Sequence, residues 1–394
     1  MGETAVGQHR VDGARAWVVA AAAAVSTFAV FGVAYSFGAF FREMSDEFGT
    51  SSSATAFVFS LTVSMSFFFG LFTGRWADRV GPRPVVLAAA ASLCAGLLAT
   101  SRVSSIWLGY LTCGLGVGFA VACGYVPMVS TVGGWFERKR ATALGVAVAG
   151  IGLGTLAGAP LAASLIDSIG WRDTYVVFGI GGGLLLLCVA AVAQKGPAAP
   201  PVAPPKPLRE LARVSDFRKL YMSSLSATFG LFIPFVFIAD YASDRGASDG
   251  SAALLIGLIG GTSVVGRLVL GGIADRVGAI GLYVGSFATM ALAHLIWLTA
   301  GERYPQLVLY TVVLGLGYGG FIALSPAVVA ERMGLDGLGG VLGTLYTSAA
   351  VGSLCGPPIA GVLIDGLGYG WAIGFAAAMA ALGTSFLIPL LRPS

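Results

Sequence analysis

Residues 74–81 read GRWADRVG and residues 271–278 read GGIADRVG, so one short motif occurs twice at an offset of 197 residues. Two other stretches repeat at almost the same offset. Residues 145–170 match 343–368 at 198, and residues 116–127 match 315–326 at 199. A nearly constant offset across three separate stretches indicates two halves with the same fold.

The composition predicts that both halves lie in a membrane. Hydrophobic residues make up 56% of the 394 residues, charged residues make up 11%, and the mean hydropathy is +0.85. Soluble domains carry about 25% charged residues. A transmembrane helix needs about 20 apolar residues. The stretches that meet this need are 17–41, 54–74, 84–101, 105–132, 140–166, 173–193, 220–241, 252–273, 280–300, 306–329, 338–364 and 371–391.

One long polar interruption, residues 195–219, contains AAPPVAPPKP at 198–207 and is predicted to be an extended linker. It separates six predicted spans from six. We therefore expect an all-α integral membrane protein with twelve transmembrane helices in two six-helix bundles. The predicted parts are an N-terminal arm (1–16), a first bundle (17–194), the linker (195–219) and a second bundle (220–394). Parallel six-helix repeats place a substrate site between the bundles at mid-depth.

The basic residues orient the chain, because cytoplasmic segments carry an excess of Lys and Arg. With both termini inside, 17 of the 23 Lys and Arg residues fall in inner segments and five in outer segments. We therefore expect a multi-pass protein of the inner (plasma) membrane whose N- and C-termini, arm and linker are cytoplasmic. The remaining basic residue is Arg267, which lies inside the apolar stretch 252–272.

Several classes of function are disfavoured. The basic residues are scattered among loops, which argues against nucleic-acid binding. The five cysteines lie in apolar stretches without metal-ligand spacing or a disulfide framework, so no metal ion or other cofactor is expected. No span offers a His pair, a carboxylate pair or a Ser–His arrangement, which argues against an enzyme. The short linker and termini leave no room for the signalling domain of a sensor.

The repeated motif resembles the loop between spans two and three of the major facilitator superfamily, and its second copy resembles that superfamily's weaker repeat. This resemblance implies the major facilitator fold and a gating role for the charges on the inner face. Asp78 is expected to pair with a basic residue or a helix end and hold the inner side shut. Arg79, Arg138 and Asp275 are the other candidates for this gate. The alternative is a helix stop with solvated charges.

Arg267 is a candidate for substrate binding on physical grounds. A guanidinium at membrane depth costs about 2.5–3.5 kcal/mol on insertion scales, and no acidic residue of another span is expected at that depth. A buried cation favours an anion, and a guanidinium fits a carboxylate in a bidentate fork. The alternative is a structural arginine that bonds a backbone carbonyl or extends toward the inner surface.

Three stretches are similar to parts of the monocarboxylate transporter family, and the chain resembles a bacterial member of it. These are 135–150, similar to the loop and start of span five, 230–241, similar to span seven, and 252–267, similar to span eight. The resemblance implies that Arg267 binds a substrate carboxylate. Tyr346, Tyr318 and Tyr125 are predicted at similar depth, where each offers a hydroxyl and an apolar ring. Phe28, in the middle of the first span, is a candidate apolar wall. Simple packing is the alternative for all four.

Two departures from that family concern proton coupling. The family's animal members carry a lysine in the outer half of span one, where this chain reads YSFGAFF at 35–41. They also carry an aspartate four residues before the arginine, where this chain has Ser263. Coupling would then use the protonation of the substrate itself, another carboxylate such as Asp240, or nothing.

We expect a secondary active transporter of small monocarboxylates such as lactate or pyruvate, coupled to protons and working by alternating access in the lipid bilayer. The alternatives are a carrier of another organic anion, either by oxalate–formate exchange or for a larger aromatic acid, and an uncoupled facilitator. A dicarboxylate exchanger is expected to carry a second cation in span eleven, and residues 338–364 contain none.

Overall fold

The computed structural model describes residues 11–196, 208–334 and 338–391, and over these ranges the protein is helical and contains no strand. The helices of the first half are α1 (Ala14–Tyr35), α2 (Phe37–Phe48), α3 (Ser52–Val80), α4 (Pro82–Thr100), α5 (Ile106–Gly109), η1 (Tyr110–Leu115), α6 (Gly116–Trp135) and α7 (Arg140–Val192). Those of the second half are α8 (Leu208–Leu211), α9 (Ser215–Leu231), α10 (Ile233–Ser243), α11 (Asp249–Val277), α12 (Ala279–Leu298), α13 (Tyr304–Met333), α14 (Leu338–Leu367), α15 (Tyr369–Leu387) and η2 (Ile388–Leu391).

The helices are long because backbone groups in a bilayer must bond one another. Within the described ranges, eleven helical segments are long and apolar enough to cross a membrane. One of them, Thr142–Val192, has 51 residues and contains two crossings. These crossings meet at Gly170, whose φ of 80° and ψ of 161° are not helical and suit a residue without a Cβ. The all-helical fold and the twelve predicted crossings are thus confirmed.

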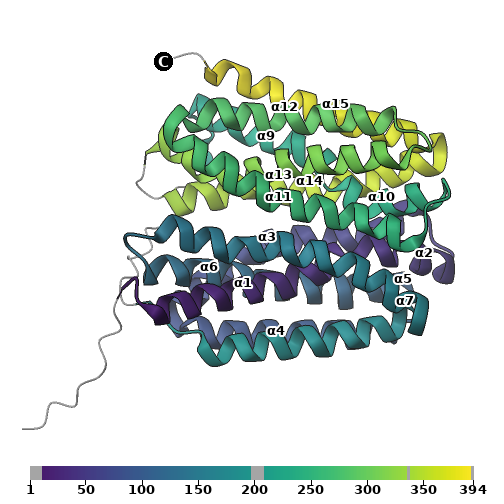
Figure 1. Cartoon of the computed structure of the whole chain (residues 1–394), viewed down its shortest axis with the longest axis horizontal. Coiled ribbons are helices and arrows are strands. Elements are labelled where there is room, and N and C mark those ends of the chain that lie inside the picture. Colours follow the sequence, from purple (N-terminus) through teal and green to yellow (C-terminus); the bar gives the residue numbers. More distant parts are fainter. Residues whose placement is uncertain (1–10, 197–207, 335–337, 392–394) are drawn as a thin grey trace, which may run out of the picture.

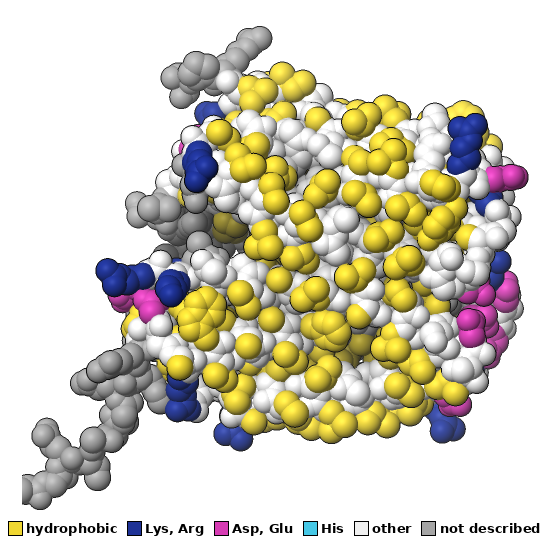
Figure 2. Space-filling view, in the orientation of Figure 1, with side chains coloured by type: hydrophobic (Ala, Val, Ile, Leu, Met, Phe, Trp, Pro, Cys, Tyr) yellow, Lys and Arg dark blue, Asp and Glu magenta, His cyan; other side chains and the backbone are white. Residues whose placement is uncertain are grey.

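The helices form two groups that lie side by side (Figure 1), one built from α1–α7 and the other from α9–α15. The helix ends nearest the two chain termini, which we call the termini end, lie on the left of this view. The opposite end, which we call the far end, includes α2, α5 and the α10–α11 turn. Hydrophobic side chains cover the middle of the surface, while charged side chains gather at the two ends (Figure 2), as a protein that crosses a bilayer requires.

The two groups meet along α7 with α11 and along α3 with α14, and at the far end along α2 with α10. Small residues make the first of these contacts close. A Cβ on Gly257 would lie 2.8 Å from the carbonyl oxygen of Leu156, and a Cβ on Gly260 would lie 2.8 Å from that of Gly152. The backbones of the two bundles therefore touch without intervening side chains.

The described part of the predicted arm is attached to the first bundle. Asp12 has a φ of 62°, and its N–H donates to the carbonyl of Trp135 at 3.1 Å. Its carboxylate accepts the backbone N–H groups of Arg138 and Lys139 at 3.1 and 3.3 Å. Arg15 donates to the side chain of Gln194 at 2.8 Å. The arm and linker also include residues 1–10 and 197–207, which lie outside the described residues.

Candidate functional site

Arg267 lies in α11 at the interface between the bundles, and its exposed fraction is 6%. Its Nη1 donates to the carbonyl of Val148, on α7 of the other bundle, at 2.7 Å. Its Nε and Nη2 are buried and have no hydrogen-bond partner. Among the described residues no carboxylate forms an ion pair with Arg267. The backbone bond is the structural role considered above, but it uses one nitrogen of three.

The two nitrogens left without partners lie on the same edge of the guanidinium. Nε–H and one N–H of Nη2 point in parallel, which is the geometry that receives both oxygens of a carboxylate. A buried donor without an acceptor costs about 1–3 kcal/mol, and more when it is charged. The bond to Val148 therefore leaves one edge of the guanidinium unsatisfied.

Two of the predicted tyrosines lie near this guanidinium. The Arg267 Cζ lies 5.7 Å from the ring centre of Tyr318 on α13, which is cation–π distance. Tyr125 on α6 lies within electrostatic range of Arg267 and packs edge-on against Phe31 at 5.3 Å between ring centres. One tyrosine comes from each bundle, so both bundles contribute to the surroundings of the cation.

Tyr346 reaches the same interface from α14, where its ring lies 6.1 Å from that of Phe67 on α3. It lies 198 residues after Val148, which is the offset of the internal repeat over this stretch. Tyr346 and Val148 thus occupy equivalent positions in the two halves. The hydroxyls of Tyr346 and Tyr125 form no hydrogen bond with any described residue and remain available to a ligand.

Phe28 is placed differently from the other predicted site residues. It lies where α1 crosses α7, and a Cβ on Gly154 would lie 3.0 Å from the Cα of Phe28. No ring contact joins it to Arg267 or the site tyrosines within the described ranges. The observed role of this stretch is close packing inside the first bundle.

The sequence analysis missed Tyr35, which closes the site toward the far end. Its hydroxyl lies 3.4 Å from that of Tyr318, so the two residues bond across the interface. Its ring packs against Phe235 at 4.7 Å and Phe59 at 6.1 Å between centres. The apolar surroundings are completed by Phe232, which stands at the break between α9 and α10. The aromatic stretch YSFGAFF at 35–41 is the sequence feature that could have pointed to Tyr35.

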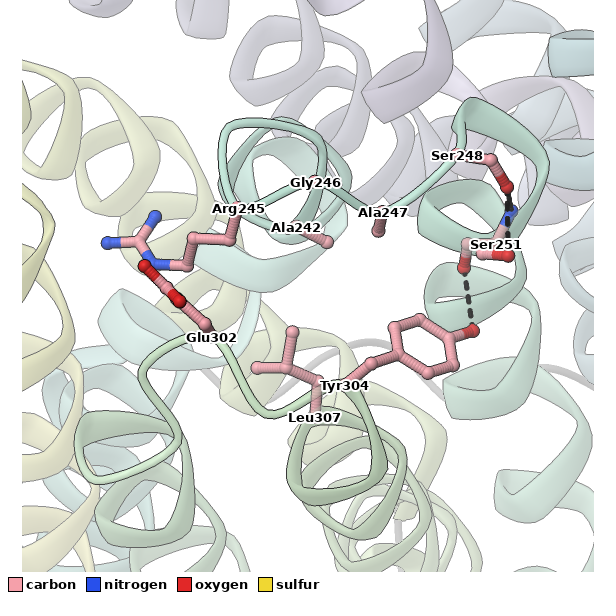
Figure 3. Close-up of a pocket in the computed structure, with 9 residues that line it drawn as sticks. All are labelled: Ala242, Arg245, Gly246, Ala247, Ser248, Ser251, Glu302, Tyr304 and Leu307. Atoms are coloured by element: carbon pink, nitrogen blue, oxygen red, sulfur yellow. Dashed lines mark hydrogen bonds between the residues drawn. The ribbon is translucent and has the colours of Figure 1, made fainter.

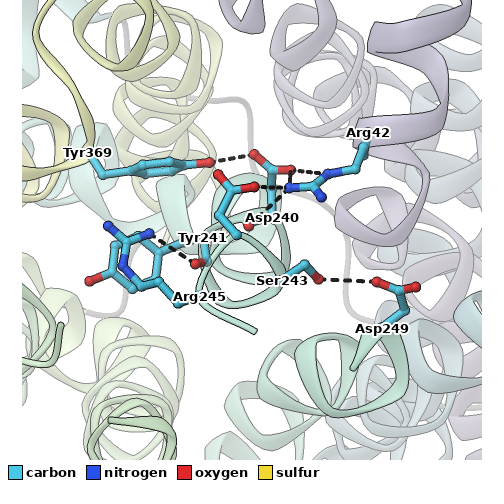
Figure 4. A network of polar contacts seen from close by, with 8 residues as sticks. Arg42, Asp240, Tyr241, Ser243, Arg245, Asp249 and Tyr369 are labelled. Atoms are coloured by element: carbon cyan, nitrogen blue, oxygen red, sulfur yellow. Dashed lines mark hydrogen bonds and ion pairs between the residues drawn. The ribbon is translucent and has the colours of Figure 1, made fainter. Parts of the chain in front are cut away.

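A charged cluster joins the bundles at the far end (Figure 4). Arg42 of α2 forms an ion pair with Asp240 of α10 at 2.6 Å and a second one with Asp244. The hydroxyl of Tyr369 donates to the other oxygen of Asp240. Asp365 adds a separate link there by accepting the N–H of Ser52 at 3.0 Å. The far end is therefore closed by polar contacts between the bundles.

The predicted gating charges at the termini end make different contacts. Asp78 is half-buried, and its carbonyl rather than its carboxylate accepts a bond, from Lys195 at 3.0 Å. Arg79 and Arg138 are exposed, and Arg138 is held through its backbone N–H by Asp12. Asp275 lies in α11, and its side chain is outside what the structure describes. The described charges at this end form no ion pair between the bundles.

A cavity of about 300 Å³ opens at the far end of the second bundle (Figure 3). Its walls include Arg245, Glu302, Tyr304 and Leu307, and it contains neither Arg267 nor any site tyrosine. Arg245 stacks on the ring of Tyr241 at 3.6 Å and donates to its carbonyl at 3.1 Å. The cation beside this cavity is thus already engaged with Tyr241.

Comparisons with known proteins show the family of this chain. The sequence profile of the Major Facilitator Superfamily matches residues 23–280 and 220–394. The chain is 34% identical over 376 residues to monocarboxylate transporter 3 of Rattus norvegicus, and the aligned region covers 90% of this chain and 75% of that protein. The chain belongs to the monocarboxylate transporter family of the major facilitator superfamily. It is also 31% identical over 374 residues to monocarboxylate transporter 4 of Rattus norvegicus, with 90% and 78% covered. Monocarboxylate transporter 12 of Rattus norvegicus is 27% identical over 416 residues, with 96% and 85% covered.

The expected class of function is confirmed at this level. The chain is a multi-pass membrane transporter of the major facilitator superfamily and not an enzyme. The resemblance found in the sequence motifs thus extends over nine tenths of the chain.

Proposed function

We propose that this transporter carries small monocarboxylates such as lactate or pyruvate. The supporting observation is the free edge of Arg267, where Nε and Nη2 are buried without partners while Nη1 is bonded to Val148. One cation with one free edge suits one carboxylate. Tyr318, Tyr346 and Tyr125 supply hydroxyls and apolar ring faces around the rest of a small acid.

Transport proceeds by alternating access in this proposal. The bundles over 17–194 and 220–394 rock about the site, and the linker over 195–219 lies in the cytoplasm with both termini, in the inner (plasma) membrane. The far end is then the outer side, where Arg42 and Asp240 join the bundles. Asp78, Arg79, Arg138 and Asp275 act at the termini end, where they meet their partners after the bundles rock.

A proton enters the cycle at Asp240 in this proposal. Asp240 is the carboxylate that contacts both Arg42 of the first bundle and Tyr369 of the second. Protonation neutralises it and weakens its attraction to Arg42, which favours opening of the outer side. Proton binding and substrate entry are thereby linked without a carboxylate beside Arg267.

The test is uptake of labelled L-lactate into proteoliposomes that contain wild-type protein, Arg267→Ala or Arg267→Lys. Truncating one partner of a buried charge pair costs about 2–5 kcal/mol, or about 30-fold or more in apparent affinity. Arg267→Ala is therefore expected to abolish uptake at concentrations that half-saturate the wild type. Lysine keeps the charge but lacks the fork, so Arg267→Lys is expected to remain strongly impaired.

Arg303→Ala is a suitable control, because Arg303 lies at the far-end surface before α13 and is outside the site. Wild-type uptake by Arg267→Ala would overturn the binding role. A thermal-shift screen separates the alternatives, since stabilisation by oxalate or by aromatic acids alone would replace lactate as the substrate class. Uptake that ignores a proton gradient would indicate an uncoupled facilitator.

A further inference from the structure

The hydroxyl of Tyr35 bonds a site residue, Tyr318, but has no role in the substrate binding proposed above. Tyr35 is the last residue of α1, and Ser36 separates α1 from α2. Its exposed fraction is 3% and that of Tyr318 is 4%. The two hydroxyl oxygens lie 3.4 Å apart and belong to different bundles.

Two phenols that bond one another use one of their two hydrogens. No other hydrogen bond of either hydroxyl occurs among the described residues, so one O–H is left to find an acceptor. The rings around the pair, from Phe235, Phe232 and Phe59, offer none. Leaving a buried donor unsatisfied costs about 1–3 kcal/mol, so the pair is suited to an incoming oxygen atom.

The position of Tyr35 and Tyr318 relative to Arg267 indicates which oxygen atom of a substrate they would bind. The Tyr318 ring lies 5.7 Å from the Arg267 Cζ, and Tyr35 is within electrostatic range of Arg267. The Tyr318 ring is thus a direct neighbour of the guanidinium that would hold the carboxylate in the proposed function. An oxygen on the carbon next to that carboxylate is the polar atom of a small acid that can meet the remaining O–H.

We propose that Tyr35, together with Tyr318, binds the oxygen on carbon 2 of a 2-hydroxy or 2-oxo monocarboxylate. Tyr35 thereby determines the preference of the transporter for such acids over acids with an unsubstituted carbon 2. This inference rests on the proposed function, because it requires the carboxylate to be held by Arg267.

The experiment measures the apparent KM for L-lactate and for propionate, which differ by the hydroxyl on carbon 2, in proteoliposomes with wild type and Tyr35→Phe. The variant keeps the ring and removes the hydroxyl. A lost neutral hydrogen bond changes affinity by about 3- to 10-fold, so the KM for lactate is expected to rise by this factor while that for propionate stays the same. Tyr310→Phe is the matched control, because its buried hydroxyl contacts His294 at 3.5 Å, away from the site.

An equal rise of both KM values would overturn the proposal, since loss of packing does not distinguish the two acids. Unchanged KM values for both acids would overturn it as well. Tyr318→Phe removes the other hydroxyl and gives the same comparison if Tyr35→Phe accumulates poorly. Failure of the proposed function is recognised separately, because Arg267→Ala would then retain uptake of both acids.

Discussion

Arg42 and Asp240 form an ion pair between the bundles at 2.6 Å, and they are 198 residues apart in the sequence. The nearest repeated motif, 74–81 with 271–278, has an offset of 197, so Arg42 and Asp240 lie one residue away from equivalent positions in the two halves. The pair thus joins α2 and α10, the corresponding short helices of the two halves, at the far end. The exposed fractions of the two side chains are 44% and 15%.

The ion pair predicts the result of a charge exchange. A partly exposed pair is worth about 1 kcal/mol or less, so Arg42→Asp alone, which sets three carboxylates together, is expected to weaken closure of the far end. The double variant Arg42→Asp with Asp240→Arg is expected to restore part of this closure. Labelling of a cysteine introduced at Tyr35 from the outside measures the opening, and equal labelling in all variants would refute the closing role.

Asp240→Asn tests the proposed proton site. The amide mimics the protonated acid, so uptake is expected to lose most of its acceleration by an inward proton gradient while some uptake remains. Asp244→Asn is the matched control, because Asp244 also pairs with Arg42, whereas the hydroxyl of Tyr369 donates to Asp240. A gradient response of Asp240→Asn as large as that of the wild type would exclude Asp240 as the proton site.

The contact between α7 and α11 predicts the effect of bulk at the interface. In Gly152→Val the added carbons meet the backbone of Gly260 and the side chain of Val264. Overpacking of this kind costs about 1–3 kcal/mol, so we expect uptake to fall by about tenfold with little change in helical content. Gly285→Val is the control, since a Cβ there meets no atom within 4 Å. Comparable losses in both variants would refute the role of the interface.

Asp12 predicts an order of stability among variants of the arm. Asp12→Ala removes the carboxylate and leaves a Cβ at a φ of 62°, whereas Asp12→Gly removes the carboxylate and tolerates this φ. The carboxylate acts like a helix cap worth about 1 kcal/mol. We expect both variants to have a lower melting temperature than the wild type, by about 2–4 °C for each kcal/mol of stability lost. The melting temperature of Asp12→Ala is expected to be the lowest. Identical melting of the two variants would show that the left-handed backbone is not retained.

Much of the fold was accessible from the sequence, because long apolar stretches and the constant repeat offset report directly on membrane crossings. The crossings within α7 were predicted as two, and the non-helical φ of Gly170 explains why one continuous helical segment still crosses twice. Arg267 was accessible for a similar reason, since a charge inside an apolar stretch is visible without any structure.

The carbonyl that Arg267 bonds could not be identified from the sequence. The bond of Arg267 to Val148 depends on how closely α7 and α11 approach, which is set by packing between distant helices. Tyr35 was overlooked because its role arises from Tyr318, 283 residues away. The backbone of Phe28 packs against Gly154 of α7, and the role of its side chain as an apolar wall stays a prediction.

The bond from Arg267 to Val148 has a kinetic consequence. When the bundles separate at this level an empty protein loses the bond and gains nothing in return, whereas a loaded protein keeps an anion on the guanidinium. In the proposed mechanism, reorientation of the empty form is then expected to be the slower half of the cycle. Vesicles preloaded with unlabelled acid should therefore take up labelled acid faster than empty vesicles do, and exchange should outpace net flux.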